Sequence, residues 1–254
     1  MNILRTIIER LSRGKVIKRR ISVNGKTFPL LVSPDAQLKY LKFGSGVFDQ
    51  DLINIAEKYL TESSNVWDVG ANVGVFTFAA SSVAHKGTVV SIEADIWLAN
   101  ILRKTAMFKE YSNNTVCVLP VAISNDNSVA SFMVAARGRA SNALEVAGGR
   151  SQMGGVREKQ YVPTLTLDTL LNIFSPPDFV KIDIEGAEHM ALQGAENLIN
   201  NVRPTFYIEV GNDVSSQVLN LFQSVGYSAF DPLGNKLADS CAPNTFFIPE
   251  KNKS

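Results

Sequence analysis

The chain has 254 residues, of which 45% are hydrophobic, so it can bury one sizeable core, or one core with a small appendage. Its 25 basic residues nearly balance 24 acidic ones, and a net charge of +1 provides no overall field that would attract nucleic acid. We therefore expect no nucleic-acid partner. The two cysteines, Cys117 and Cys241, form no metal-ligand cluster and argue against a disulfide framework, which favours a reducing, cytoplasmic location.

The first eleven residues are predicted to form an amphipathic helix, because their apolar residues recur at helical spacing. The segment lacks the features of a signal peptide and is too short to span a bilayer. A basic cluster follows at Arg10, Arg13, Lys15, Lys18, Arg19 and Arg20. The simpler interpretation is a docking helix with a solvated face. The alternative is a weak contact of this basic N-terminus with an anionic membrane surface or a phosphorylated substrate.

A β-hairpin and a helix are expected next. Strand-forming residues at 18–23 and 26–32 flank Asn24-Gly25, the strongest short-range hairpin signal. Residues 49–59 have the apolar spacing of a helix. We therefore divide the chain into a helix-and-hairpin prefix, residues 1–46, and a main domain, residues 47–254.

Apolar strands alternate with helices from residue 66 onwards. Strands are expected at 66–70, 88–93, 116–123, 179–184 and 205–210, and helices at 75–84, 97–108, 187–200 and 214–225. A closing antiparallel pair is expected from 227–230 and 244–248. This alternation predicts an α/β fold whose mostly parallel sheet carries helices on both faces.

More than fifty residues separate the third and fourth of these strands. Residues 129–135 and 160–166 resemble two extra strands, and residues 137–155 between them are glycine-rich and basic. In an open α/β sheet such an insertion would lie near the carboxyl ends of the strands, where ligands bind. Two interpretations stay open, a segment that covers the substrate and a merely mobile insertion.

The segment from Val66 to Thr77 carries the pattern D-x-G-x-N-x-G, formed by Asp68, Gly70, Asn72 and Gly74. A buried strand here enters a glycine turn and then a helix, as in nucleotide-binding α/β folds. The dinucleotide pattern G-x-G-x-x-G is absent from this loop. An acid before the loop repels a phosphate but attracts an ammonium group or ribose hydroxyls. The loop therefore predicts a nucleoside ligand with a cationic amino-acid part, as in S-adenosylmethionine; an ordinary strand-to-helix turn is the simpler alternative.

The next strand ends in Glu93, about twenty residues beyond the glycine loop, which is the usual spacing for an acid that binds ribose. One carboxylate can accept hydrogen bonds from both ribose hydroxyls. The alternative for Glu93 is an acid on the surface at a strand end. Asp95 is expected to cap the following helix.

A second group of charged residues follows the fourth strand. Alternation places Lys181, Asp183 and Glu185 on one side, where charges are tolerable only if the strand end opens into a cleft. Asp183 or Glu185 is then a candidate general base or a ligand for a hydroxyl or cation. The alternative is an ion-pair network with Lys181. His189 in the next helix and Glu209 at the end of the fifth strand are further candidates.

Several of these motifs occur together in one known family. The segments are V-W-D-V-G-A-N-V-G (66–74), I-E (92–93), P-V-A-I-S (120–124), V-P-T-L-T-L-D (162–168) and V-K-I-D-I-E-G-A-E (180–188). Over about residues 48–209, the chain resembles the FkbM family of S-adenosylmethionine-dependent methyltransferases. The resemblance implies the seven-stranded class I methyltransferase (Rossmann-like) sheet and usually O-methylation of sugar or polyketide hydroxyls. Members often have proline after the acid of the second strand, where this chain has Ala94.

Together, the residues and the resemblance predict a site. The cofactor S-adenosylmethionine is expected to contact Asp68, Gly70, Asn72, Gly74, Glu93 and Ala122. The catalytic candidates are Asp183, Glu185, His189 and Glu209, acting by alignment and deprotonation in a direct transfer without a metal. The expected acceptor is a small molecule or a glycan.

Two alternative classes of function stay open. An NAD(P)-binding oxidoreductase would share the sheet, although it would need the absent G-x-G-x-x-G loop. The other is a cofactor-binding protein without catalysis. The oligomeric state is not indicated by the sequence.

Overall fold

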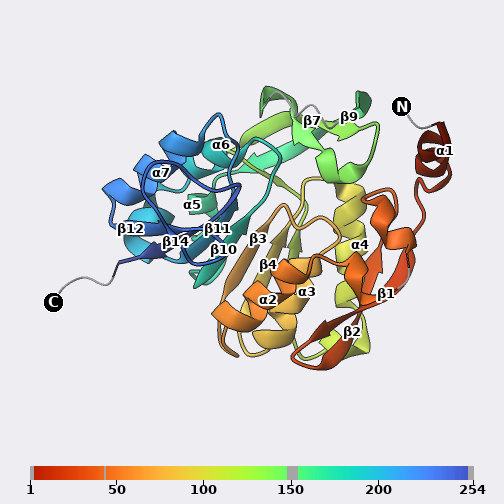
Figure 1. The fold of residues 1–254 in the computed structure, drawn as a ribbon, viewed down its shortest axis with the longest axis horizontal. Coiled ribbons are helices and arrows are strands. Elements are labelled where there is room, and N and C mark those ends of the chain that lie inside the picture. Colours follow the sequence, from red (N-terminus) through yellow and green to blue (C-terminus); the bar gives the residue numbers. More distant parts are fainter. Residues whose placement is uncertain (1–2, 43, 148–153, 251–254) are drawn as a thin grey trace.

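The computed structural model describes residues 3–42, 44–147 and 154–250, which form an α/β fold around a large central sheet (Figure 1). The eight strands of this sheet lie in the order β13-β12-β14-β11-β10-β3-β4-β5. They are β3 (Val66–Val69), β4 (Thr88–Ile92), β5 (Thr115–Leu119), β10 (Phe179–Ile182), β11 (Thr205–Glu209), β12 (Tyr227–Phe230), β13 (Lys236–Leu237) and β14 (Asn244–Pro249).

The sheet is mixed. Strands β5, β4, β3, β10 and β11 pair in parallel, whereas β14 is antiparallel to both β11 and β12. The expected closing antiparallel pair is therefore confirmed, and so is the class I methyltransferase arrangement. The two-residue strand β13 adds an eighth strand to the seven expected, and a segment so short has no periodicity that would reveal it.

Helices cover both faces of the sheet, as predicted. One face carries α2 (Gln50–Tyr59), α3 (Val75–Val83) and α4 (Ile96–Ala106), and the other carries α5 (Leu167–Leu170), α6 (Glu188–Gln193) and α7 (Ser215–Ser224). Successive strand residues enter opposite cores, as Phe179 and Val180 of β10 show. Side chains alternate between the two faces along any strand, so a strand covered on both faces contributes to both cores.

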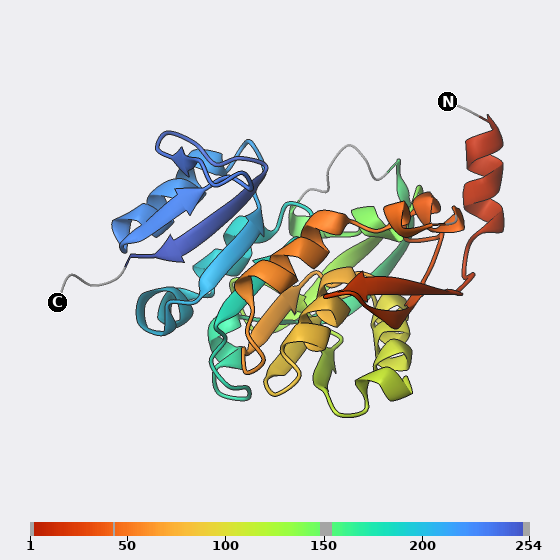
Figure 2. The same cartoon turned by 60° about the horizontal axis from the view of Figure 1, so that its bottom comes forward.

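The prefix packs against the main domain. Helix α1 (Ile3–Leu11) lies at the edge of the molecule, and β1 (Ile17–Val23) pairs with β2 (Lys26–Val32) in the predicted hairpin, which turns at Asn24 and Gly25 (Figure 2). The apolar face of this hairpin joins the core of α3 and α4. At the end of α1, Leu11 is 72% exposed. The contact of the basic N-terminus with an anionic membrane surface stays a prediction. Within the described ranges, no helix combines the length and apolarity needed to cross a membrane.

Two predicted elements are divided in the structure. The expected strand 116–123 is split, because β5 ends at Leu119 and β6 (Ala122–Ile123) belongs to another sheet. Pro120 between them has no N–H to continue the ladder. The expected helix 187–200 ends with α6, and a π-helical turn, Leu198–Val202, follows. At the break, a Cβ on Gly194 would lie 2.6 Å from the Ser124 carbonyl oxygen, so only glycine fits this close approach.

The insertion forms a small sheet of its own, with the order β6-β9-β7-β8. Strands β7 (Ser128–Ala135) and β9 (Val156–Leu165) confirm the two extra strands, and β8 (Ala143–Leu144) pairs with β7. Part of the predicted glycine-rich loop, residues 148–153, lies outside the described residues.

Candidate active site

A cleft of about 350 Å³ opens at the carboxyl ends of β3, β4, β10 and β11. In an open α/β sheet, ligands bind at this edge, where the strand order reverses. The strand side of the cleft is lined by Val69, Gly70, Asn72, Ile92, Glu93, Ala94, Asp183, Ile184, Glu185 and Glu209. The insertion lines it with Val121, Ala122, Ile123, Phe132 and residues 139–144.

The cleft contains most of the predicted site residues but not all of them. Seven are among its lining residues: Gly70, Asn72, Glu93, Ala122, Asp183, Glu185 and Glu209. Asp68, Gly74 and His189 are not. The described part of the insertion therefore lines the cleft, and its role as a cover for the substrate stays a prediction.

The two glycines of the loop serve the fold itself. Gly70 has φ +76°, and a Cβ there would lie 1.9 Å from the carbonyl oxygen of Asp183. Gly74 caps α3 with φ +89°, and a Cβ there would lie 2.5 Å from Leu102 Cδ2. Close packing of the loop on the end of β10 and on α4 thus requires glycine at both positions. Gly70 also lines the cleft, and the cofactor contacts expected of Gly70 and Gly74 stay predictions.

Glu93 holds the glycine loop from the end of β4. Its Oε2 accepts a hydrogen bond from the Asn72 N–H at 2.7 Å, and its Oε1 accepts one from the Asp95 N–H at 2.8 Å. Burial raises the pKa of Glu93 to about 7, aided by the charge of Asp95 and opposed by the two amides and by Lys181. Each carboxylate oxygen has a second lone pair, so the group can still accept ligand hydroxyls.

Asn72 offers a further acceptor in the cleft. The residue has φ +54°, a left-handed conformation that asparagine tolerates. Its Oδ1 is buried and receives no hydrogen bond from the residues that the structure describes. A buried oxygen of this kind is satisfied when a ligand brings a donor to it.

Asp68 lies beneath the loop rather than in the cleft. It is fully buried, accepts a 2.6 Å hydrogen bond from Thr77 Oγ1, and pairs with Lys181 Nζ at 3.1 Å. The prediction that Asp68 faces the cofactor therefore receives no support from its position. Its contacts tie β3 to α3 and β10.

Lys181 is the cation at the centre of this edge. Its Nζ donates to the Gly70 carbonyl oxygen at 2.8 Å and lies 3.6 Å from Asp183 Oδ2. Burial alone would lower the pKa of Lys181, but the carboxylates of Asp68 and Asp183 hold it above the ordinary value. The network with Lys181 is therefore present, and it leaves 42% of the Asp183 side chain exposed.

The carboxylates of Asp183, Glu185 and Glu209 line the cleft, the first two from the segment that follows β10 and the third from the end of β11. The predicted alternation does not extend to Glu185, because β10 ends at Ile182 and Glu185 lies in a turn with φ +49°. His189 lies on α6, where its Nε2 is 3.3 Å from Gln193 Nε2. The structure thus brings together three of the four catalytic candidates.

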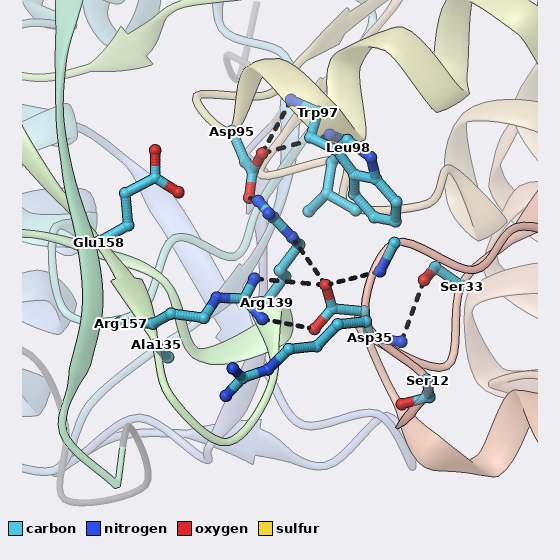
Figure 3. Close-up of polar contacts among 12 residues, drawn as sticks. Ser12, Ser33, Asp35, Asp95, Trp97, Leu98, Ala135, Arg139, Arg157 and Glu158 are labelled. Carbon is cyan, nitrogen blue, oxygen red and sulfur yellow. Dashed lines mark hydrogen bonds and ion pairs between the residues drawn. The ribbon is translucent and has the colours of Figure 1, made fainter. Parts of the chain in front are cut away.

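Sequence reasoning missed a buried ion network beside the cleft (Figure 3). Arg139 bridges Asp95 and Asp35, with Nε 3.2 Å from Asp35 Oδ2, and its guanidinium stacks 4.7 Å from the Trp97 ring. Arg157 adds a 2.9 Å contact to Asp35. Burial alone would raise the pKa of the Asp35 carboxyl, but the two arginines hold it below its ordinary value.

This network fixes the cleft wall to the prefix. Asp95 caps α4 as predicted, since it accepts hydrogen bonds from the N–H groups of Trp97 and Leu98. The Arg139 N–H also donates to the Asp35 carbonyl oxygen at 2.8 Å. The only sequence signal was the basic stretch at residues 137–139, and nothing in the sequence linked it to Asp35.

The described residues include no group of three or more His, Cys, Asp or Glu side chains arranged to hold a metal ion. The charged side chains that line the cleft are carboxylates and the guanidinium of Arg139. Such a lining can accept hydrogen bonds from hydroxyls and stabilise a nearby positive charge.

Solved structures with similar folds include several methyltransferases. Methyltransferase FkbM from Methylobacillus flagellatus KT is 17% identical, with a TM-score of 0.46 over 85% of this chain and 58% of that chain. A SAM-dependent O-methyltransferase from Thermotoga maritima is 12% identical, with a TM-score of 0.44 over 95% and 80%. A 16S rRNA methyltransferase from T. thermophilus, solved with AdoMet and guanosine, is 11% identical, with a TM-score of 0.49 over 93% and 51%.

The chain thus spans less than two thirds of the Methylobacillus protein. No curated protein matches the sequence. The model of the methyltransferase FkbM domain matches residues 68–229, from the acid of the glycine loop to strand β12. This match spans more than half of the chain, which therefore belongs to the FkbM methyltransferase family.

Proposed function

We propose that the cleft binds S-adenosylmethionine and that the protein transfers its methyl group to a hydroxyl of a sugar, a glycan or another small natural product. The observation that carries this proposal is the convergence of Glu93, Asn72, Asp183, Glu185 and Glu209 on one cleft at the strand ends. Membership of a methyltransferase family supports the reaction class. The choice of oxygen as the methyl acceptor rests on the carboxylates, which suit proton removal from a hydroxyl.

The residues of the cleft fit this cofactor. Glu93 sits at the end of the second strand of the sheet, where its carboxylate can accept the two ribose hydroxyls. The buried Oδ1 of Asn72 supplies an acceptor for a ligand N–H or O–H group. When bound, S-adenosylmethionine supplies a methyl group on a positively charged sulfur. The carboxylates around the cleft favour such a positive charge.

The reaction needs alignment and a proton acceptor. Asp183 is our candidate base, because it lines the cleft and keeps part of its side chain exposed there. Its carboxylate would take the proton of the acceptor hydroxyl while Lys181 holds the side chain in place. Glu185 and Glu209 would hold the acceptor by its remaining hydroxyls. Apolar lining residues such as Phe132 and Leu144 would shield the reacting groups from water.

Calorimetric titration of the protein with S-adenosylmethionine and, separately, with NAD tests the cofactor. We expect binding of the first and none of the second, and the reverse result would favour an oxidoreductase. Glu93→Ala should weaken the binding of S-adenosylmethionine by about 1–3 kcal/mol, the scale of hydrogen bonds to a charged group.

Turnover is then measured as the release of S-adenosylhomocysteine with a panel of hydroxylated sugars. Asp183→Asn should lower turnover by about a hundredfold or more, with little change in cofactor binding. Glu185→Gln and Glu209→Gln identify the base if Asp183→Asn retains turnover. His189→Ala, outside the cleft lining, is the matched control and should retain parental turnover.

A further inference from the structure

A second hollow, of about 730 Å³, adjoins the cleft on the side of the prefix. The two share Gln37, Ala140 and Ser141 as lining residues, so they border each other at these three residues. We name the second hollow the outer hollow. A molecule whose reacting hydroxyl lies among the carboxylates of the cleft can therefore extend into the outer hollow.

Two segments that are far apart in the sequence form the walls of the outer hollow. One runs from Pro34 to Lys42 and the other from Arg137 to Ser141. They are held together by the bridge from Arg139 to Asp35. They also touch directly, since a Cβ on Gly138 would lie 3.1 Å from the Ala36 carbonyl oxygen. The shape of the outer hollow is thus fixed by buried contacts.

The lining of the outer hollow is basic. Lys39, Lys42 and Arg137 contribute three cations against one carboxylate, Glu9. Among the residues that the structure describes, none of these three cations forms a salt bridge or a side-chain hydrogen bond, whereas Arg139 and Arg157 next to them are paired with carboxylates.

The charge of the lining therefore changes from positive in the outer hollow to negative in the cleft. Arg139, the one cation among the described lining residues of the cleft, is paired with Asp35 and Asp95. Five carboxylates line the cleft, those of Asp49, Glu93, Asp183, Glu185 and Glu209. An acceptor with an anionic group would be oriented by this field, with its anionic end outward and its neutral hydroxyl inward.

We propose that the outer hollow binds an anionic group, a phosphate or a carboxylate, of the molecule that is methylated. This proposal rests on the proposed function of the cleft and narrows the acceptor to an anionic hydroxyl compound, such as a sugar phosphate or a uronic acid. Lys39, Lys42 and Arg137 contact the anion, and Ser141 lies between the two parts of the site. Lysine and arginine donate charge-assisted hydrogen bonds to phosphate and carboxylate oxygens.

The test compares neutral and anionic acceptors on the full chain. A panel of hexoses, the matching hexose 6-phosphates and the matching hexuronic acids is offered with S-adenosylmethionine, and both binding and S-adenosylhomocysteine release are measured. We expect the anionic members to be preferred, and the preference to weaken as salt is added. Comparison of the phosphates with the uronic acids shows which anion is bound.

The triple variant K39Q/K42Q/R137Q removes the cations of the outer hollow. It should weaken the binding of the preferred anionic member by about tenfold, while leaving the affinity for S-adenosylmethionine and the denaturation midpoint unchanged. The control variant R103Q/K104Q/K236Q removes the same charge from exposed residues that line neither part of the site. Equal preference for neutral and anionic members, or equal effects of the two triple variants, would overturn the proposal. If the parent protein does not bind S-adenosylmethionine, the proposed function itself would be overturned instead.

Discussion

The contact between the glycine loop and strand β10 gives a prediction with a matched control. In Gly70→Ala, the new Cβ would lie 1.9 Å from the Asp183 carbonyl oxygen, so β3 and β10 must move apart at their carboxyl ends. The left-handed φ of +76° costs a non-glycine residue about 1–2 kcal/mol, and overpacking of this kind costs about 1–3 kcal/mol more. We therefore expect a loss of about 2–5 kcal/mol in the free energy of unfolding.

Gly25→Ala in the β1–β2 turn isolates the steric part of this loss. Gly25 has a similar φ of +72°, but a Cβ there would meet nothing within 4 Å, so only the backbone cost of about 1–2 kcal/mol remains. Urea denaturation of both variants gives the two free energies. Gly70→Ala should also lose affinity for S-adenosylmethionine, because Gly70 and Asp183 both line the cleft. If the two variants unfold at the same urea concentration, the close contact between the loop and β10 is wrong.

Three further predictions concern buried charges. The pKa of Glu93 is raised in the folded protein from 4.5 to about 7. The free energy of unfolding should therefore fall by up to about 3 kcal/mol as the pH rises from 4.5 to 7, because ionisation of Glu93 is harder in the folded protein than in the unfolded chain. Glu93→Gln should flatten this dependence, as measured by urea titrations at several pH values. Arg139→Gln should cost about 2 kcal/mol, less than the usual loss for a buried pair, because Asp35 keeps Arg157 and Asp95 keeps its hydrogen bonds from Asn142 and the first turn of α4. An unchanged denaturation midpoint would refute a stabilising role. Lys181→Met should cost about 3–5 kcal/mol, because it leaves the fully buried carboxylate of Asp68 without its cation. A denaturation midpoint equal to that of the parent would contradict this account.

The sequence alone determined the order of the main elements and the edge of the sheet at which the cleft opens. Apolar alternation identified the parallel strands, and the closing antiparallel pair followed from two short apolar segments near the C-terminus. The expected positions of Glu93 and Asp183 at the cleft agree with the structure, because residues that end parallel strands meet at one edge of the sheet. The cap formed by Asp95 was also predictable, since it depends only on the next three residues.

Only the tertiary structure decided what several of these residues do. Gly70 and Asp68 were expected to face a ligand, and Gly70 does line the cleft. The structure adds that their close contacts are with Asp183 and Lys181, more than one hundred positions away in the sequence. Arg139 and Asp35 are separated by 104 positions, and their pairing fixes a wall of the site. Sequence periodicity reports which face of its own element a residue occupies. The partner across the fold depends on how the elements pack, which no local pattern contains.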